Sequence, residues 1–240
     1  MLMLLRRQLL LLLLFAPFGF AQADLVQVAS PDRQIEVRLM VAQPHELYAL
    51  PRIAYQVDFR GKRLLDTSYL GFNIDAQEPM LGENVGLISS KLDSEKNFNS
   101  LLAEYMQNGS LGRRISVEVR AYNDGIAFRY IIPRSTPLEQ FSIASEETQF
   151  RFAEDVSGYP LVEQPGIGWV AIRDTRADHY APMSLERVDR RTLISTLAPL
   201  AGHPSIAVVA TSPMVSPWRV LVISADRNRA ADSKLVASLQ

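Results

Sequence analysis

The chain has 240 residues, a formal net charge of −1 at pH 7 and no cysteine. Without cysteine it has neither a disulfide scaffold nor the residue that an N-terminal lipid anchor requires. The near-balanced charge and the lack of a basic run argue against a nucleic-acid partner.

The N-terminus has the pattern of a secretory signal peptide. Arg6 and Arg7 precede a leucine-rich apolar segment, and Ala23 ends a small-x-small cleavage motif. The apolar segment is shorter than the roughly 20 residues that a membrane-spanning helix needs. We therefore expect a signal peptide over 1–23 and a mature domain over 24–240, without membrane attachment after cleavage. Export without disulfides fits a periplasmic location.

Alternation of apolar and polar residues predicts short strands through the first part of the mature chain. We expect a first hairpin around Ser30-Pro31-Asp32, a strand within 47–59, and a return strand after the turn at 60–62. A further short extended piece is expected at 68–74. From 75 to 112 the alternation weakens, which predicts loops with a few short strands.

The clearest pattern is an antiparallel hairpin between Ile115 and Ile132. Two alternating segments flank the turn Asn123-Asp124-Gly125, where we expect the glycine to take the positive φ that a tight turn needs. The hairpin predicts a β-rich domain.

The remaining chain continues as short strands and ends in a segment with helical spacing. Many short strands separated by turns predict an all-β fold, a large antiparallel β-sandwich in a single domain. The expected strands are 141–143 paired with 147–152, 169–172, 183–188, 206–210 and 219–223, and the helical spacing falls at 230–239.

Candidate chemistry is sparse. There is no phosphate-binding glycine loop and no HExxH motif. His45, His179 and His203 lie far apart in loop-like segments, and we interpret them as exposed loop residues rather than ligands. Trp169 and Trp218 could stack on a sugar, but their apolar neighbours favour core packing.

One carboxylate stands at the end of an expected strand. Asp174 follows the apolar strand 169–172, and a carboxylate placed there could bind calcium. A full calcium site needs 6–8 oxygens from several segments, so one aspartate is weak evidence. A solvated loop with an Arg173–Asp174 ion pair is the alternative interpretation.

Several segments, in order, resemble the N-terminal domain of glycoside hydrolase family 97. The resemblance covers nearly the whole mature chain and implies a β-super-sandwich similar to galactose mutarotase. Its most specific parts are RAYNDGIAFRY at 120–130 and SPWRV at 216–220, and the weaker parts are SPD at 30–32, SYLGF at 68–72, EETQF at 146–150 and VAI at 170–172.

The resemblance also implies a function. The family's enzymes are α-glucosidases and α-galactosidases of the bacterial periplasm, and their N-terminal domain packs on a (β/α)8 barrel that carries the catalytic carboxylates. No residue of this chain is therefore assigned as catalytic, and no substrate-binding residue is identified. A calcium ion in the family's site takes one ligand from the N-terminal domain. The matching position here is Asp174, where the family has glutamate, and Thr175 follows where the family has alanine.

Three functions follow as hypotheses. The first is a non-catalytic module of a family 97 α-glycosidase, which binds α-linked oligosaccharide, packs on a barrel and shares calcium with it. Because the sequence ends at Gln240, where the family continues into the barrel, it would be truncated or part of a split enzyme. It should expose a large apolar patch. The second is a free-standing periplasmic carbohydrate-binding protein with a polar, aromatic groove. The third is a mutarotase-like enzyme, which needs an acid and a base facing one pocket.

Overall fold

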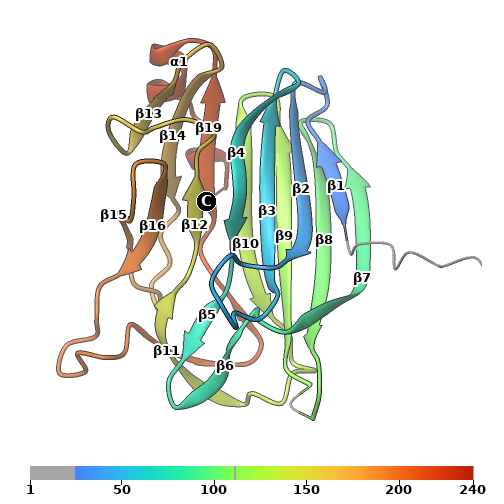
Figure 1. Cartoon of the computed structure of the whole chain (residues 1–240), viewed down its shortest axis with the longest axis vertical. Coiled ribbons are helices and arrows are strands. Elements are labelled where there is room, and N and C mark those ends of the chain that lie inside the picture. The colour runs from blue at the N-terminus through green and yellow to red at the C-terminus, as the bar shows by residue number, and fades with distance from the viewer. Residues whose placement is uncertain (1–24, 111, 240) are drawn as a thin grey trace, which may run out of the picture.

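The computed structural model describes residues 25–110 and 112–239, so the expected signal peptide over 1–23 lies outside the described residues. The chain folds as antiparallel sheets packed in layers, and its helices are confined to a short segment near the C-terminus (Figure 1). The expectation of an all-β sandwich is confirmed. No helix in the described part is both long enough and apolar enough to cross a membrane.

The larger layer is an eight-stranded sheet in the order β13-β14-β19-β10-β9-β8-β7, with β18 paired to β10. Its strands are β7 (Val85–Ser94), β8 (Phe98–Gln107), β9 (Arg114–Tyr122), β10 (Gly125–Ile132), β13 (Leu161–Gln164), β14 (Gly168–Asp174), β18 (Met214–Val215) and β19 (Arg219–Ser224).

Three smaller sheets complete the fold, in the orders β1-β2-β3-β4, β17-β11-β5-β6 and β12-β16-β15. Their strands are β1 (Val26–Ala29), β2 (Ile35–Ala42), β3 (Arg52–Phe59), β4 (Lys62–Tyr69), β5 (Phe72–Ile74), β6 (Gln77–Leu81), β11 (Gln140–Glu146), β12 (Gln149–Arg151), β15 (Met183–Arg187), β16 (Thr192–Leu197) and β17 (Val208–Thr211). After β19 come helix α1 (Arg227–Asp232) and the 3-10 helix η1 (Val236–Leu239).

Aromatic contacts join the layers in the core. The Tyr55 ring of β3 lies 5.2 Å from the Phe128 ring of β10, and the Phe72 ring of β5 lies 4.6 Å from the Tyr130 ring of β10. Strand β10 carries these rings because alternate residues of a strand point to the same face. The predicted hairpin β9–β10 therefore supplies the centre of the core.

Gly125 takes the positive φ expected from the sequence, at +157°, and it is required for a second reason as well. A Cβ at this position would lie 2.3 Å from the backbone oxygen of Leu221 and 3.0 Å from Cα of Val222. The glycine therefore allows β19 to lie directly against the start of β10, where Gly125 pairs with Val222. Close approach of two backbones is a recognised use of glycine within strands.

Two local expectations were wrong. The segment expected to hold loops contains the ten-residue strands β7 and β8, which pair over almost their full length. Most side chains of β7 are exposed, so it lacks the apolar alternation that marks a half-buried strand. Strands β11 and β12 do not pair with each other: β11 pairs with β5 and β17, and β12 pairs with β16.

Candidate functional site

A buried ionic cluster lies where β14 and β19 meet β11. Asp174 ends β14 and Arg219 begins β19, and the two residues are directly opposite in the register of this strand pair. Directly opposite residues in an antiparallel pair point to the same face, which here is the face that packs on the core. Glu146 ends β11, in a different sheet, and meets Arg219 from the other side.

Glu146 and Arg219 form a bidentate ion pair. Nε of Arg219 donates to Oε1 of Glu146 at 2.7 Å, and Nη2 donates to Oε2. Neither side chain has any exposed surface. The Thr148 hydroxyl donates to Oε1 at 2.7 Å, and the Tyr180 hydroxyl donates to Oε2 at 2.9 Å. The Tyr130 hydroxyl shares a short hydrogen bond with the Thr148 hydroxyl.

Glu146 and Arg219 each keep the other ionised. Burial by itself raises the pKa of Glu146, but the charge and hydrogen bonds of Arg219 outweigh it, so the pKa lies below its usual value. Burial by itself lowers the pKa of Arg219. The charge and hydrogen bonds of the Glu146 carboxylate outweigh this effect, so the Arg219 pKa lies above its usual value. Burial, followed by the charge of Glu146, raises the pKa of Tyr130 and Tyr180, which keeps both hydroxyls protonated as donors.

Asp174 lies at the edge of this cluster. Its Oδ2 is 3.8 Å from Nη1 of Arg219 and accepts the backbone N–H of Met183 at 3.1 Å. The Asp174 side chain is 22% exposed, whereas Nη1 of Arg219 is buried and has no hydrogen-bond partner. Because Glu146 already neutralises Arg219, the three side chains carry a net charge of about −1, with the excess at the exposed end.

The cation beside Asp174 is not the neighbouring Arg173. Consecutive strand residues point to opposite faces, so Arg173 faces the outer side of the sheet. Its Nη1 donates to the backbone oxygen of Ile172. The interpretation of 173–174 as a solvated ion pair is therefore wrong, and Arg219 takes that place.

These residues do not form a calcium site by themselves. Calcium takes 6–8 oxygen ligands, and Oδ2 of Asp174 is already engaged by Met183. Within 25–110 and 112–239, no three His, Cys, Asp or Glu residues gather in a way that could hold a metal ion. Asp174 can offer one carboxylate ligand to a site completed by other groups, next to the opposing charge of Arg219.

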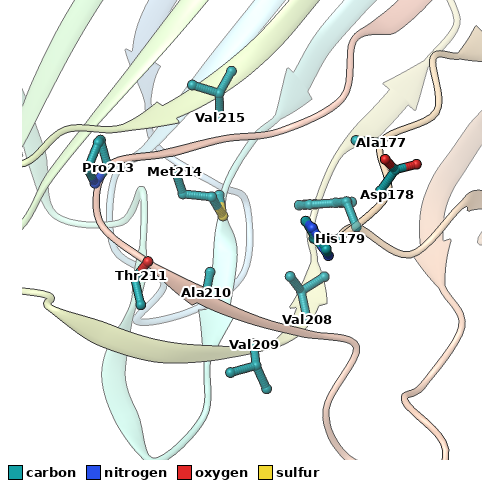
Figure 2. Close-up of a pocket in the computed structure, with 11 residues that line it drawn as sticks. Ala177, Asp178, His179, Val208, Val209, Ala210, Thr211, Pro213, Met214 and Val215 are labelled. Carbon is teal, nitrogen blue, oxygen red and sulfur yellow. The ribbon is translucent and has the colours of Figure 1, made fainter.

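An apolar groove of about 550 Å³ opens beside the cluster (Figure 2). Asp178 and His179 stand on one side of it, with Thr211 and Pro213 on the other. Tyr180 lines the groove and also donates to Glu146, so it connects the groove with the ion pair. The other lining residues are Ala177, Val208, Val209, Ala210, Met214 and Val215.

Two of the lining side chains are exposed to solvent although they are apolar. Val209 is 63% exposed and Val215 is 48% exposed. A second hollow of about 300 Å³ adjoins the groove, since both contain Ala177 and Tyr180, and its walls include Pro182 and Pro217. The smaller hollow also includes Thr175, the residue that follows Asp174, so the hollowed and largely apolar surface begins one residue after Asp174.

The histidines and tryptophans follow their expected environments in most respects. His45, His179 and His203 are exposed, and they stand in different segments of the chain. Trp218 is buried at 5% exposure, with the guanidinium carbons of Arg120 and Arg129 at 4.6 and 4.3 Å from its ring centre. Trp169 is only half-buried.

The sequence had no signal for the roles of Glu146 and Arg219, although both lie in segments with family resemblance. In β11 the inward positions begin as Phe141 and Ile143, which would place Ser145 inward next. A bulge between Ile143 and Ser145 shifts the alternation, so Glu146 is buried instead.

The fold and cluster define a large antiparallel β-sandwich domain with an ionic bridge between its sheets. The family model described as "Glycosyl-hydrolase 97 N-terminal" matches residues 28–161, more than half of the chain. The chain therefore belongs to this family. No curated protein matches it in sequence.

Solved structures show the same fold. A variant of a Glycoside Hydrolase Family 97 enzyme from Pseudoalteromonas sp. strain K8 aligns with a TM-score of 0.73 and 19% identity, over 90% of this chain and 38% of that one. The same enzyme in complex with acarbose gives a TM-score of 0.71 at 18% identity, with the same coverage of both chains. A beta-arabinopyranosidase gives 0.68 at 20% identity, over 83% of this chain and 40% of that one. This chain thus spans about two fifths of those enzymes.

Proposed function

We propose that this chain is the non-catalytic N-terminal module of a family 97 α-glycosidase, which docks on a catalytic (β/α)8 barrel and contributes Asp174 to the shared active site. One observation carries the proposal. The partly exposed carboxylate of Asp174 accepts from Met183 and faces Arg219, and the partner of Arg219, Glu146, accepts from Tyr180 of the apolar groove. A carboxylate fixed at a surface that also exposes valines is suited to face a second folded body.

The ionic cluster has a structural role in this proposal. Arg219, Thr148 and Tyr180 together donate four hydrogen bonds to the two oxygens of Glu146, and the side chain has no exposed surface. A general acid or base must reach the reacting group directly or through one water. Glu146 therefore anchors Arg219 rather than transferring protons, and the catalytic carboxylates belong to the barrel.

Calcium is part of the same proposal. The trio of Glu146, Arg219 and Asp174 leaves one excess negative charge at the exposed end, which favours a cation there. Asp174 would supply one ligand and the barrel the others, because no three His, Cys, Asp or Glu side chains gather for a metal ion within the described residues. The sequence also predicts an export signal and a periplasmic location. Both are consistent with an enzyme that degrades α-linked oligosaccharides outside the cytoplasm.

Co-purification tests the docking. The chain is expressed with the family 97 barrel of its own source genome, with an affinity tag on the barrel only, and we expect the two to elute together. The changes Val209→Asp and Val215→Asp should abolish co-elution, because they put charge into the apolar groove. Val188→Asp is the matched control, since Val188 is 61% exposed and does not line this groove. Co-elution that survives both groove changes, or a source genome without such a barrel, would contradict the proposal.

The alternative of a free-standing carbohydrate-binding protein would use a different hollow. A hollow of about 450 Å³ is lined by polar residues and by the Phe98 and Tyr122 rings, whose centres are 5.0 Å apart. Arg120 already lies 4.9 Å from the Phe98 ring, and Tyr122 is only 8% exposed, so this hollow offers a sugar little aromatic surface. Binding of the purified chain on a glycan array, lost in Phe98→Ala, would favour this alternative over docking.

A further inference from the structure

The eight-stranded sheet ends at a long strand, β7, and the part of it that matters here is the segment 89–94. Strand β7 has ten residues and pairs with β8, and none of the other described strands pairs with its outer edge. Figure 1 shows β7 at the margin of the molecule, away from β14 and the β15–β16 hairpin. A free strand edge presents unpaired backbone N–H and C=O groups, which can pair with another strand.

Apolar side chains are exposed at this margin. Leu92 of β7 is 63% exposed, and Ile88 of the same strand is 42% exposed. Leu92 is directly opposite Leu101 of β8, which is fully buried, so Leu92 faces the core side of the sheet. Of the second layer, β2 contacts β7, whereas β1 packs on β8 and β9, and the Leu92 side chain stays largely exposed.

Charged residues usually protect a sheet edge, but those of β7 have opposite signs. Lys91 and Asp93 flank Leu92, point to the outer face, and are 75% and 57% exposed. Within one strand they form a long ion pair of 3.5 Å between Nζ and Oδ2. An exposed pair of this kind contributes little to stability. Opposite charges therefore lie symmetrically on the two sides of one apolar residue, Leu92.

We propose that two copies of this chain pair antiparallel through β7, about a two-fold axis at Leu92. Lys91 of each copy is then directly opposite Asp93 of the other, Ser90 is opposite Ser94, and the two Leu92 side chains meet on the core side. Opposite charges in directly opposed positions stabilise a strand pair, and like charges destabilise it. Centring the axis on Lys91 or on Asp93 would place like charges opposite each other, so the charges select one register.

The extent of pairing is also limited by the strand itself. The β7–β8 register shifts between Leu87 and Ser89, and such a bulge bends the strand and ends regular pairing. The pairing segment is therefore short, from about Ser89 to Glu95, and predicts a weak dimer rather than an obligate one. The β7 edge is separate from the groove beside β17 and β18, so dimerisation and barrel docking are independent.

Light scattering coupled to size exclusion tests the proposal on the full chain. At about 100 µM protein we expect an average mass above that of the monomer, which rises toward twice the monomer mass as the concentration increases. Lys91→Asp should return the protein to a monomer, because two pairs of aspartates then face each other. The charge-swapped double variant Lys91→Asp with Asp93→Lys should restore the dimer. A wild-type monomer at this concentration, or a single variant that stays dimeric, would overturn the proposal.

A cysteine placed on the axis gives an independent readout. Directly opposed strand residues have Cα atoms about 4.5–5.5 Å apart, within the range that a disulfide bridges. Because the chain has no cysteine of its own, Leu92→Cys should give a single cross-linked dimer under mild oxidation. Val188→Cys, with a similar exposure of 61%, is the control and should stay largely monomeric. Equal cross-linking of the two variants would show random collision and contradict the register.

Discussion

Arg219 and Glu146 form an ion pair with no exposed surface that links two different sheets of the sandwich. They are 73 positions apart in the chain. Removing two charges from water is costly, so such a pair persists only with good geometry and further hydrogen bonds. Thr148 and Tyr180 supply those bonds to the carboxylate. The pair holds the Arg219 side chain in position next to Asp174.

Glu146→Gln should destabilise the protein by about 3–5 kcal/mol, because it leaves Arg219 buried without its counter-charge. The measurement is the free energy of unfolding from urea denaturation at pH 7. The control is Glu104→Gln, which removes a partly exposed partner of Arg114 and should cost less than about 1 kcal/mol. If the two variants lose the same unfolding free energy, the buried ion pair contributes no more to stability than the exposed one.

The same pair predicts a pH dependence. The pKa of Glu146 in the folded protein is below its ordinary value of 4.5, so below that pH the unfolded state binds more protons than the folded state. Its contribution is therefore complete above pH 4.5 and is lost as pH falls through the folded-state pKa. The difference in unfolding free energy between wild type and Glu146→Gln should narrow below pH 4.5. A constant difference from neutral to acid pH would disagree with a depressed pKa.

Asp174→Asn should change the unfolding free energy by about 1 kcal/mol or less, since Asp174 is partly exposed and Glu146 still neutralises Arg219. Its effect should appear in the assembled enzyme, where we expect weaker calcium activation. Asp174→Glu keeps the charge and extends the carboxylate by one methylene, and should retain the activation. Calcium titration of the chain–barrel complex measures both, and an unchanged titration in Asp174→Asn would remove this residue from the metal site.

Gly125→Ala should cost about 2 kcal/mol or more, because the new Cβ would lie 2.3 Å from the backbone oxygen of Leu221. Gly86→Ala is the matched control in the same sheet, since the nearest atom to its Cβ is 3.8 Å away. Thermal denaturation should separate the two variants clearly. Similar melting temperatures would mean that β19 can move away from the turn at no cost.

The sequence predicts the hairpins well, for a physical reason. Half-buried strands such as β2 and β9 alternate apolar and polar residues, and this alternation can be recognised in the amino-acid sequence. Strand β7 is missed because most of its side chains face solvent, so packing imposes no pattern on it. The partners of β11 and β12 are missed because strand pairing is a long-range property that local alternation leaves open.

The candidate site was only partly predictable. Asp174 was identified by resemblance to the family, and the structure places it at the end of β14, while its role as a calcium ligand stays a prediction. Glu146 points inward because of a bulge between Ile143 and Ser145, and the residue types in this segment do not predict a bulge. Arg219 begins a strand that is buried on both faces, where an arginine is tolerated only because Glu146 meets it from another sheet.

Hydrolysis of p-nitrophenyl α-glucoside, measured with the chain alone and with its family 97 barrel added, tests the central claim most directly. We predict no hydrolysis above background by the chain alone, and hydrolysis once the chain and the barrel are combined. Turnover by the chain alone would contradict the claim that this sandwich is a docking module whose catalytic carboxylates lie elsewhere.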